Sequence, residues 1–355
     1  MKKSLLFAIV AIMSLSCNSQ NHELKLWYNT PAQQWTDALP LGNGRLGAMI
    51  FGTPSQERIQ INEETIWGGG PHNNVNYAAK DGLEQIRQAL WEGRRSDAQA
   101  LCDEYISSKS AHGMPYQTAG SLMLDFDGIT DFTDYYRELD LNRAVALTRF
   151  KANGIEYTRE SFVSFPDQVI VMRLTASQKG ALSFNASYNL PYRDDRIVNK
   201  AAALLHDGKV GVLSLTCKGD DHEGIEGKIR FTDYAVVEAD GGKITVVDDR
   251  DLTVKDADVV TIYISIGTNF VNYQDVSGDN LKKATEPALK FRDGKDKDKY
   301  EKALAAHIKE YQKQFNTVSL DLGTNDQAKL PTDQRVAQFA STFDPQMVEL
   351  YFQFG

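Results

Sequence analysis

The clearest pattern along the chain is a series of β-type runs between Ala181 and Phe270. Alternating, β-branched and aromatic residues are dense in 182–190 (LSFNASYNL), 210–218 (VGVLSLTCK), 229–239 (IRFTDYAVVEA), 243–247 (KITVV) and 259–270 (VVTIYISIGTNF). Glycine accepts a positive φ, so Asp207-Gly208 and Asp240-Gly241-Gly242 predict hairpin turns between these runs. The last run begins almost wholly apolar, which is typical of a strand covered on both faces. Antiparallel strands at this spacing predict a sandwich rather than a parallel sheet.

The region from Glu23 to about Thr175 also favours strands, with one helical interruption. Residues 155–174 (IEYTRESFVSFPDQVIVMRL) predict two strands separated at Phe165-Pro166-Asp167, because proline cannot donate to a ladder and Pro-Asp favours a turn. Gly93 predicts a break between two helices in the interruption, near 78–108. Their apolar positions follow helical spacing: Leu83, Ile86, Leu90, Ala98, Leu101, Cys102 and Tyr105.

Helical periodicity returns towards the C-terminal end. In 299–315 one face carries Tyr300, Leu304, His307, Ile308, Tyr311 and Phe315. The charged run 292–299 before it predicts a solvated loop, and 318–323 (VSLDLG) predicts a short strand. Asp344-Pro345 is a helix-start signature. In the helix that follows, only Gln346, Glu349 and Gln353 interrupt the apolar surface. Such a helix needs cover on most sides from the rest of a barrel, so we expect its apolar residues to be exposed in this chain alone.

The N-terminal segment has the features of an export signal. Lys2 and Lys3 precede an apolar stretch, residues 5–13, that is well short of the ~20 residues a spanning helix needs. Ser16-Cys17 resembles the lipobox of bacterial lipoproteins. We therefore expect lipidation at Cys17 and a periplasmic or outer-membrane location in a Gram-negative bacterium. An ordinary signal peptide, in which Cys17 is incidental, is the alternative.

Composition excludes several classes of protein. The 355 residues carry 39 Lys and Arg against 48 Asp and Glu, a net charge of −9 with no strong basic run, so no nucleic-acid partner is expected. A mean hydropathy of −0.41 excludes a polytopic membrane protein. The six histidines show no metal-ligand spacing, and we expect neither a metal nor a cofactor. Cys102 and Cys217 are expected to be separate thiols.

Two glycine-dense stretches carry the most distinctive local signal. They are Gly42-Asn43-Gly44 and Gly68-Gly69-Gly70, within 39–71 (LPLGNGRLGAMIFGTPSQERIQINEETIWGGGP). They lack the rest of a dinucleotide or phosphate-loop fingerprint. From local features alone, tight hairpin turns account for them equally well.

These motifs resemble the N-terminal signature of glycoside hydrolase family 95, the inverting α-L-fucosidases. The resemblance continues through 116–126 (YQTAGSLMLDF), 136–141 (YRELDL), 157–162 (YTRESF) and 348–355 (VELYFQFG). It implies a mainly β fold, an antiparallel β-super-sandwich followed by a helical linker and the first helix of an (α/α)6 barrel. The implied boundaries are 1–17 for the signal peptide, 23–276 for the super-sandwich, 277–333 for the linker and 334–355 for the start of the catalytic domain.

The resemblance also implies that the catalytic carboxylates lie outside these residues. The family uses a Glu acid and an Asp base in the barrel, and inversion needs two carboxyl groups ~6.5–9.5 Å apart. Adjacent Glu63 and Glu64 should point to opposite faces of a strand. Asp194 and Asp195 lie beside Arg193 and Arg196, which indicates a salt-bridged loop. We therefore assign no catalytic residue and expect the chain to be inactive alone.

Five residues of the first motif are candidates for contact with sugar. Trp67 could stack on a sugar face, and Asn43, Arg45, Asn62 and His72 could bond hydroxyls. The structural alternative is a packed Trp67, with the Asn and Arg side chains satisfying turn carbonyls.

The implied function is therefore that of an exported α-L-fucosidase acting on a fucosylated oligosaccharide or glycan. Its domain would support the catalytic barrel, which is missing from this chain, and could wall the cleft. Membrane contact is expected only through the lipid anchor. The alternatives are α-L-galactosidase specificity in the same family and a non-catalytic carbohydrate-binding lipoprotein.

Overall fold

The computed structural model describes residues 23–108, 113–191, 193–292, 296 and 298–355, so Cys17 and the predicted signal peptide lie outside the described residues. The chain divides into two compact units. Lys25–Val318 holds the β-sheet, and Ser319–Gly355 groups with Glu23 and Leu24. In the described part of the chain, no helix has the length and apolar character needed to cross a bilayer.

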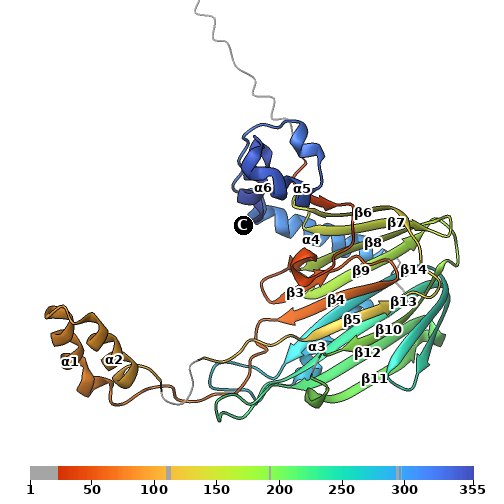
Figure 1. Cartoon of the computed structure of the whole chain (residues 1–355). Coiled ribbons are helices and arrows are strands. Elements are labelled where there is room, and N and C mark those ends of the chain that lie inside the picture. The colour runs from red at the N-terminus through yellow and green to blue at the C-terminus, as the bar shows by residue number, and fades with distance from the viewer. Residues whose placement is uncertain (1–22, 109–112, 192, 293–295, 297) are drawn as a thin grey trace, which may run out of the picture. The chain divides into compact units, whose positions relative to one another are not determined.

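The unit Lys25–Val318 is built on one curled, 14-stranded antiparallel sheet, which Figure 1 shows as a continuous surface. Its connectivity confirms the predicted mainly β, antiparallel super-sandwich, because short hairpin links place most consecutive strands side by side. The strands are β1 (Lys25–Tyr28), β2 (Leu39–Gly42), β3 (Leu46–Ile50), β4 (Gln56–Glu63), β5 (Gly120–Asp125), β6 (Thr133–Asp140), β7 (Val145–Ala152), β8 (Ile155–Ser164), β9 (Val169–Ala176), β10 (Leu182–Asn189), β11 (Ile197–Leu205), β12 (Val210–Lys218), β13 (Arg230–Val247) and β14 (Asp251–Thr268).

Strand β14 joins the two halves of the sheet. One of its edges pairs with β13 from Asp251 to Thr268. Its other edge is shared: residues 252–257 pair with β10, and residues 259–264 pair with β9. In the described strands, backbone pairing therefore links the run β1-β6-β7-β8-β9 to the run β10-β5-β4-β3-β2 through β14. This explains its apolar sequence, since Ile262, Tyr263 and Ile264 are fully buried.

Two details of the strand prediction are wrong. The segment Asp240-Gly241-Gly242 is not a hairpin turn but a register shift within the continuous strand β13. Gly241 and Gly242 have φ of 72° and 61°, values that glycine adopts freely at a bulge. Residues 318–323 form no strand. Conversely, β11 is a strand although its Ala-rich sequence has little strand propensity and does not predict one.

Six α-helices are present in the described residues, and they confirm the predicted helical segments. They are α1 (Ala79–Trp91), α2 (Arg95–Tyr105), α3 (Asn280–Ala288), α4 (Lys299–Phe315), α5 (Thr332–Gln338) and α6 (Pro345–Phe354). Gly93 has φ of 76° between α1 and α2, which confirms the break predicted there. Helix α3 lies directly on β14: a Cβ at Gly267 would be 2.3 Å from the backbone nitrogen of Ala284.

Helix α4 packs across the sheet through its aromatic face. Tyr300 and His307 are buried and contact Phe162 of β8, with ring centroids 5.9 and 5.0 Å apart. Tyr311 continues this row, and its hydroxyl donates to the carbonyl of Leu141 at 2.7 Å. The predicted amphipathic face is confirmed, and it anchors the helix on the sandwich.

Helix α6 presents a largely buried polar side and a largely exposed apolar side. Asp344 caps it as expected, accepting a hydrogen bond from the backbone of Met347 at 3.0 Å. Of the polar stripe, Gln346 and Glu349 are buried and Gln353 is half-buried. Arg335 bonds Asp344 at 2.8 Å and Gln346 at 2.7 Å inside this unit. The apolar residues are largely exposed, as expected for this chain, and Tyr351 is 78% accessible.

Candidate functional site

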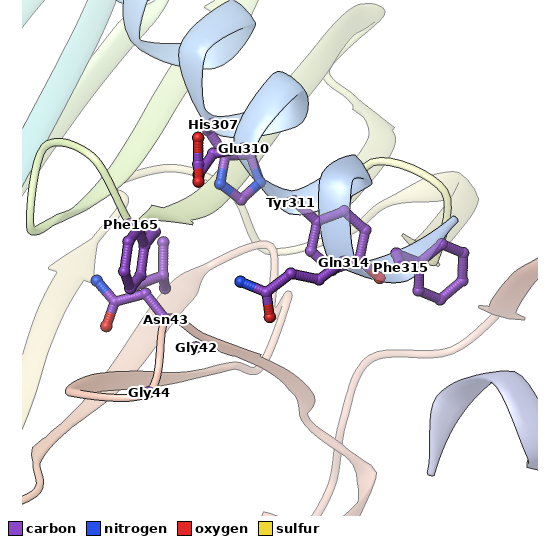
Figure 2. A pocket seen from close by; sticks show the side chains of 10 residues that line it. Gly42, Asn43, Gly44, Phe165, His307, Glu310, Tyr311, Gln314 and Phe315 are labelled. Carbon is purple, nitrogen blue, oxygen red and sulfur yellow. The ribbon is translucent and has the colours of Figure 1, made fainter. Parts of the chain in front are cut away.

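A cavity of about 460 Å³ opens between the β2–β3 hairpin and helix α4 (Figure 2). Three segments that are far apart in the sequence build it: the hairpin, the end of β8 and the second half of α4. The lining residues are Gly42, Asn43, Gly44, Val163, Phe165, His307, Glu310, Tyr311, Gln314 and Phe315. Its size is that of a small-molecule site.

Asn43 holds the hairpin side of this cavity in place. Its Oδ1 accepts hydrogen bonds from the backbone of Arg45 at 3.1 Å and Leu46 at 2.7 Å. Its Nδ2 donates to the carbonyl of Ser164 at 2.9 Å, which ties the hairpin to the end of β8. Gly44, at φ of 91°, allows the tight turn. Much of the Asn43 amide is therefore used in shaping the cavity wall.

Arg45 turns away from this cavity into a second one, of about 420 Å³. Its Nε donates to Oε1 of Gln168 at 2.7 Å, and its Nη1 donates to the carbonyl of Ile266 at 2.9 Å. The same nitrogen lies 3.4 Å from Glu63, whose other oxygen accepts from both the amide and hydroxyl of Thr65 at 2.7 Å. Arg45 and Glu63 therefore satisfy one another and the surrounding backbone.

Trp67, the side chain predicted to stack on a sugar face, is exposed to solvent. Its side chain is 44% exposed, and its indole nitrogen donates to the carbonyl of Glu64 at 2.8 Å. The Tyr116 ring stands edge-on to it, with centroids 5.1 Å apart and planes at 61°. Tyr116 is held in turn by its hydroxyl, which donates to the carbonyl of Glu63 at 2.9 Å. The two rings form a fixed, solvent-facing aromatic pair.

The remaining predicted contacts do not converge on one place. Asn62 is half-buried, and its Oδ1 has no hydrogen-bond partner among the described residues. His72 is exposed, with its Nδ1 2.7 Å from the carbonyl of Gly70. Asn43 and Arg45 share a hairpin but line different cavities. Contact of all five residues with sugar stays a prediction. Tyr116, which packs against Trp67, is a neighbour that the sequence did not single out, although it begins the motif 116–126.

The adjacent carboxylates of the sequence lie as predicted. Glu63 is buried and Glu64 exposed, so the two do not face one bond. Arg193 bonds Asp195 at 3.2 Å and also pairs with Asp220, which confirms a salt-bridged segment. Among the residues with described positions, no three His, Cys, Asp or Glu side chains gather as a metal site, and Cys102 and Cys217 are unpaired thiols.

The comparisons with known proteins account for both units. Residues 26–273 match the family described as Glycosyl hydrolase family 65, N-terminal domain, and residues 299–355 match the Glycosyl hydrolase family 95 catalytic domain. The chain belongs to the glycosyl hydrolases, as a family 65-type N-terminal domain leading into a family 95 catalytic domain. The resemblance to family 95 carried by its motifs is thereby confirmed.

Curated relatives of this glycosyl hydrolase chain are α-fucosidases. Alpha-L-fucosidase 2 of Arabidopsis thaliana is 33% identical over 94% of the chain and 41% of its own length. Probable alpha-fucosidase A of Aspergillus niger is 27% identical over 93% of the chain and 42% of its own length. The chain thus spans less than half the length of these relatives.

A solved structure shares the fold. A putative kojibiose phosphorylase from the human microbiome superposes on 86% of this chain and 40% of its own, with a TM-score of 0.50 at 11% identity. At that identity the likeness concerns architecture alone.

Proposed function

We propose that this chain is the N-terminal part of an exported α-L-fucosidase that releases α-linked L-fucose from glycans with inversion of configuration. The single observation that supports this most strongly is the match to α-fucosidases along 94% of the chain. In this proposal the sandwich supports the catalytic domain, and the Trp67–Tyr116 pair faces the glycan. The acid and the base come from the barrel in this proposal, as the resemblance to family 95 implies. Within this chain, the carboxylates of Glu63 and Asp195 are bonded to Thr65 and Arg193.

The test is hydrolysis of a 4-nitrophenyl α-L-fucoside by the protein translated from the whole reading frame, followed by NMR. We expect β-L-fucose as the first product, because a single displacement inverts the anomeric centre. The chain of 355 residues, assayed alone, should give no turnover. Initial release of α-L-fucose, turnover by the chain alone, or preference for the matching α-L-galactoside would each contradict the proposal. Absence of all hydrolysis would favour a non-catalytic binding protein.

The role of Trp67 is tested in the same protein. Trp67→Phe should lower kcat/KM about tenfold, since a lost stacking surface costs roughly 1–2 kcal/mol. Trp35→Phe is the matched control, because Trp35 is also exposed and lies in another part of the sandwich unit. A lower Tm with unchanged kinetics would make Trp67 a structural residue instead.

We also propose that Cys17 carries the lipid that anchors the protein to the membrane of a Gram-negative bacterium. Several acyl chains hold a protein firmly, whereas a single one binds only marginally. Cells grown with an alkyne fatty acid should label the wild-type protein and not Cys17→Ala. Cys102→Ala is the control and should label normally. Equal labelling of wild type and Cys17→Ala would leave an ordinary signal peptide as the explanation.

A further inference from the structure

We propose that the cavity between the β2–β3 hairpin and α4 is a binding site for one neutral sugar residue of a glycan. This inference rests on the proposed function for the source of the ligand, while the site itself is argued from the cavity. Its volume of about 460 Å³ falls within the range of small-molecule sites. No residue in it belongs to the Trp67–Tyr116 pair.

The apolar side of the cavity offers ring faces. Phe165 is 52% exposed at the end of β8, although large aromatic side chains gain most from burial. Opposite it, Tyr311 and Phe315 are stacked with centroids 5.1 Å apart and planes at 21°. Figure 2 shows these rings on two sides of the cavity. A pyranose presents C–H groups on its flat faces, and such faces pack on aromatic rings.

The polar side of the cavity offers an uncommitted amide. Gln314 extends from α4 toward the hairpin that carries Asn43, as Figure 2 shows. Its side chain makes no hydrogen bond to any other described residue. An amide supplies both a donor and an acceptor, which is what a sugar hydroxyl requires. Asn43 adds a second amide. Its Nδ2 carries two hydrogens and donates one of them to the carbonyl of Ser164.

The charges of the residues that line the cavity favour a neutral ligand. Glu310 is its one carboxylate, and Lys313 lies 2.5 Å from it. The His307 imidazole contacts the carbonyls of Arg143 and Ala144 at 3.0 and 3.2 Å, and burial lowers its pKa, so it is uncharged at neutral pH. The lining therefore holds no free cation for a phosphate or a carboxylated sugar.

The walls are fixed before any ligand arrives. Asn43 ties the hairpin to Ser164, and His307 and Tyr311 tie α4 to the turn between β6 and β7. A preformed site loses little conformational freedom on binding, so weak individual contacts suffice for measurable affinity. Gln314 and Phe165 are exposed at its rim, and their replacement should leave the fold intact.

The test is titration of the full chain with methyl α-L-fucopyranoside and with 2′-fucosyllactose, followed by saturation-transfer NMR and calorimetry. We expect saturable binding, weakened about three- to tenfold by Phe165→Ala and by Gln314→Ala. Lys309→Ala, on the exposed side of the same helix, is the matched control and should bind as wild type. Circular dichroism should be unchanged in all three variants.

Three outcomes would overturn the inference. They are no saturable binding of either probe, equal binding by wild type and both rim variants, and equal or tighter binding of L-fucose 1-phosphate. Because the titration needs no turnover, its failure is separate from a failure of fucosidase activity in the whole protein. Binding lost in Trp67→Phe but kept in both rim variants would place the ligand at the aromatic pair instead.

Discussion

Replacing Arg159 by methionine should lower the free energy of unfolding by about 3–5 kcal/mol, because it leaves a buried carboxylate without its partner. Arg159 is 3% exposed, and its Nη1 lies 2.8 Å from Glu57, which is fully buried. The same guanidinium donates to the carbonyls of Thr53 at 2.7 Å and Pro54 at 2.6 Å. It therefore fixes the β3–β4 connection onto β8, beyond its pairing with Glu57.

Urea unfolding followed by circular dichroism measures this effect. The double variant Glu57→Leu with Arg159→Met should recover much of the loss, because no charge is then left buried. Arg87→Met is the control: Arg87 pairs with Glu84 at 2.6 Å on the exposed surface of α1, and such pairs contribute well under about 1 kcal/mol. A loss below about 1 kcal/mol in Arg159→Met would show that the pair is not sequestered from water.

Asp233→Asn should stabilise the protein at pH 7, by an amount that grows with pH. Asp233 is fully buried in β13, and neither carboxylate oxygen has a hydrogen-bond partner among the described residues. Burial, and then the charge of Glu63, raise the pKa of Asp233 well above its ordinary value. Two other buried side chains couple to it electrostatically, the Tyr188 hydroxyl and the Cys217 thiol.

The sign of this pH dependence follows from the protons that the folded and unfolded states bind. The folded protein keeps the Asp233 proton, whereas the unfolded chain releases it above about pH 4. Stability is therefore lost as pH rises from about 4 toward the folded pKa, by about 1.4 kcal/mol per pH unit within that window. Asparagine cannot ionise and escapes this loss.

The difference in unfolding free energy between Asp233→Asn and wild type should thus be larger at pH 7 than at pH 4.5. Asp240→Asn is the matched control, since Asp240 is exposed on the same strand. A difference that does not change between the two pH values would mean that Asp233 is ionised in the folded protein, with water inside the sandwich as its partner.

The local pattern of apolar, polar and β-branched residues predicts most of the strands and helices of this fold. Strands β8, β9, β10 and β12 lie where alternating and β-branched residues predict them, and α4 begins and ends at the predicted residues. The errors arise where pairing with a neighbouring strand outweighs the low intrinsic strand propensity of a segment. β11 is a strand because β12 offers it a pairing edge, and Asp240 to Gly242 stays in a strand because β14 continues beside it.

The candidate site was less predictable, because its contacts join distant parts of the chain. Asn43 bonds Ser164, 121 residues away, and Arg45 bonds Ile266, 221 residues away. Both residues were recognised as polar groups in a glycine-rich motif. That they bond backbone carbonyls was the structural alternative at the sequence level. The motif does not show that these carbonyls belong to Ser164 and Ile266, nor that the ends of β8 and α4 complete a cavity beside Asn43.

The shared strand β14 also sets the order in which the protein can be assembled during synthesis. β9 and β10 both need β14 as a neighbour, yet it is the last strand to leave the ribosome. At 5–20 residues per second, roughly 5–20 s separate the completion of β9 from that of β14. For that time two open strand edges are available to other chains, which is the geometry that promotes aggregation. Nascent chains should therefore depend on a holding chaperone until residue 268 has emerged.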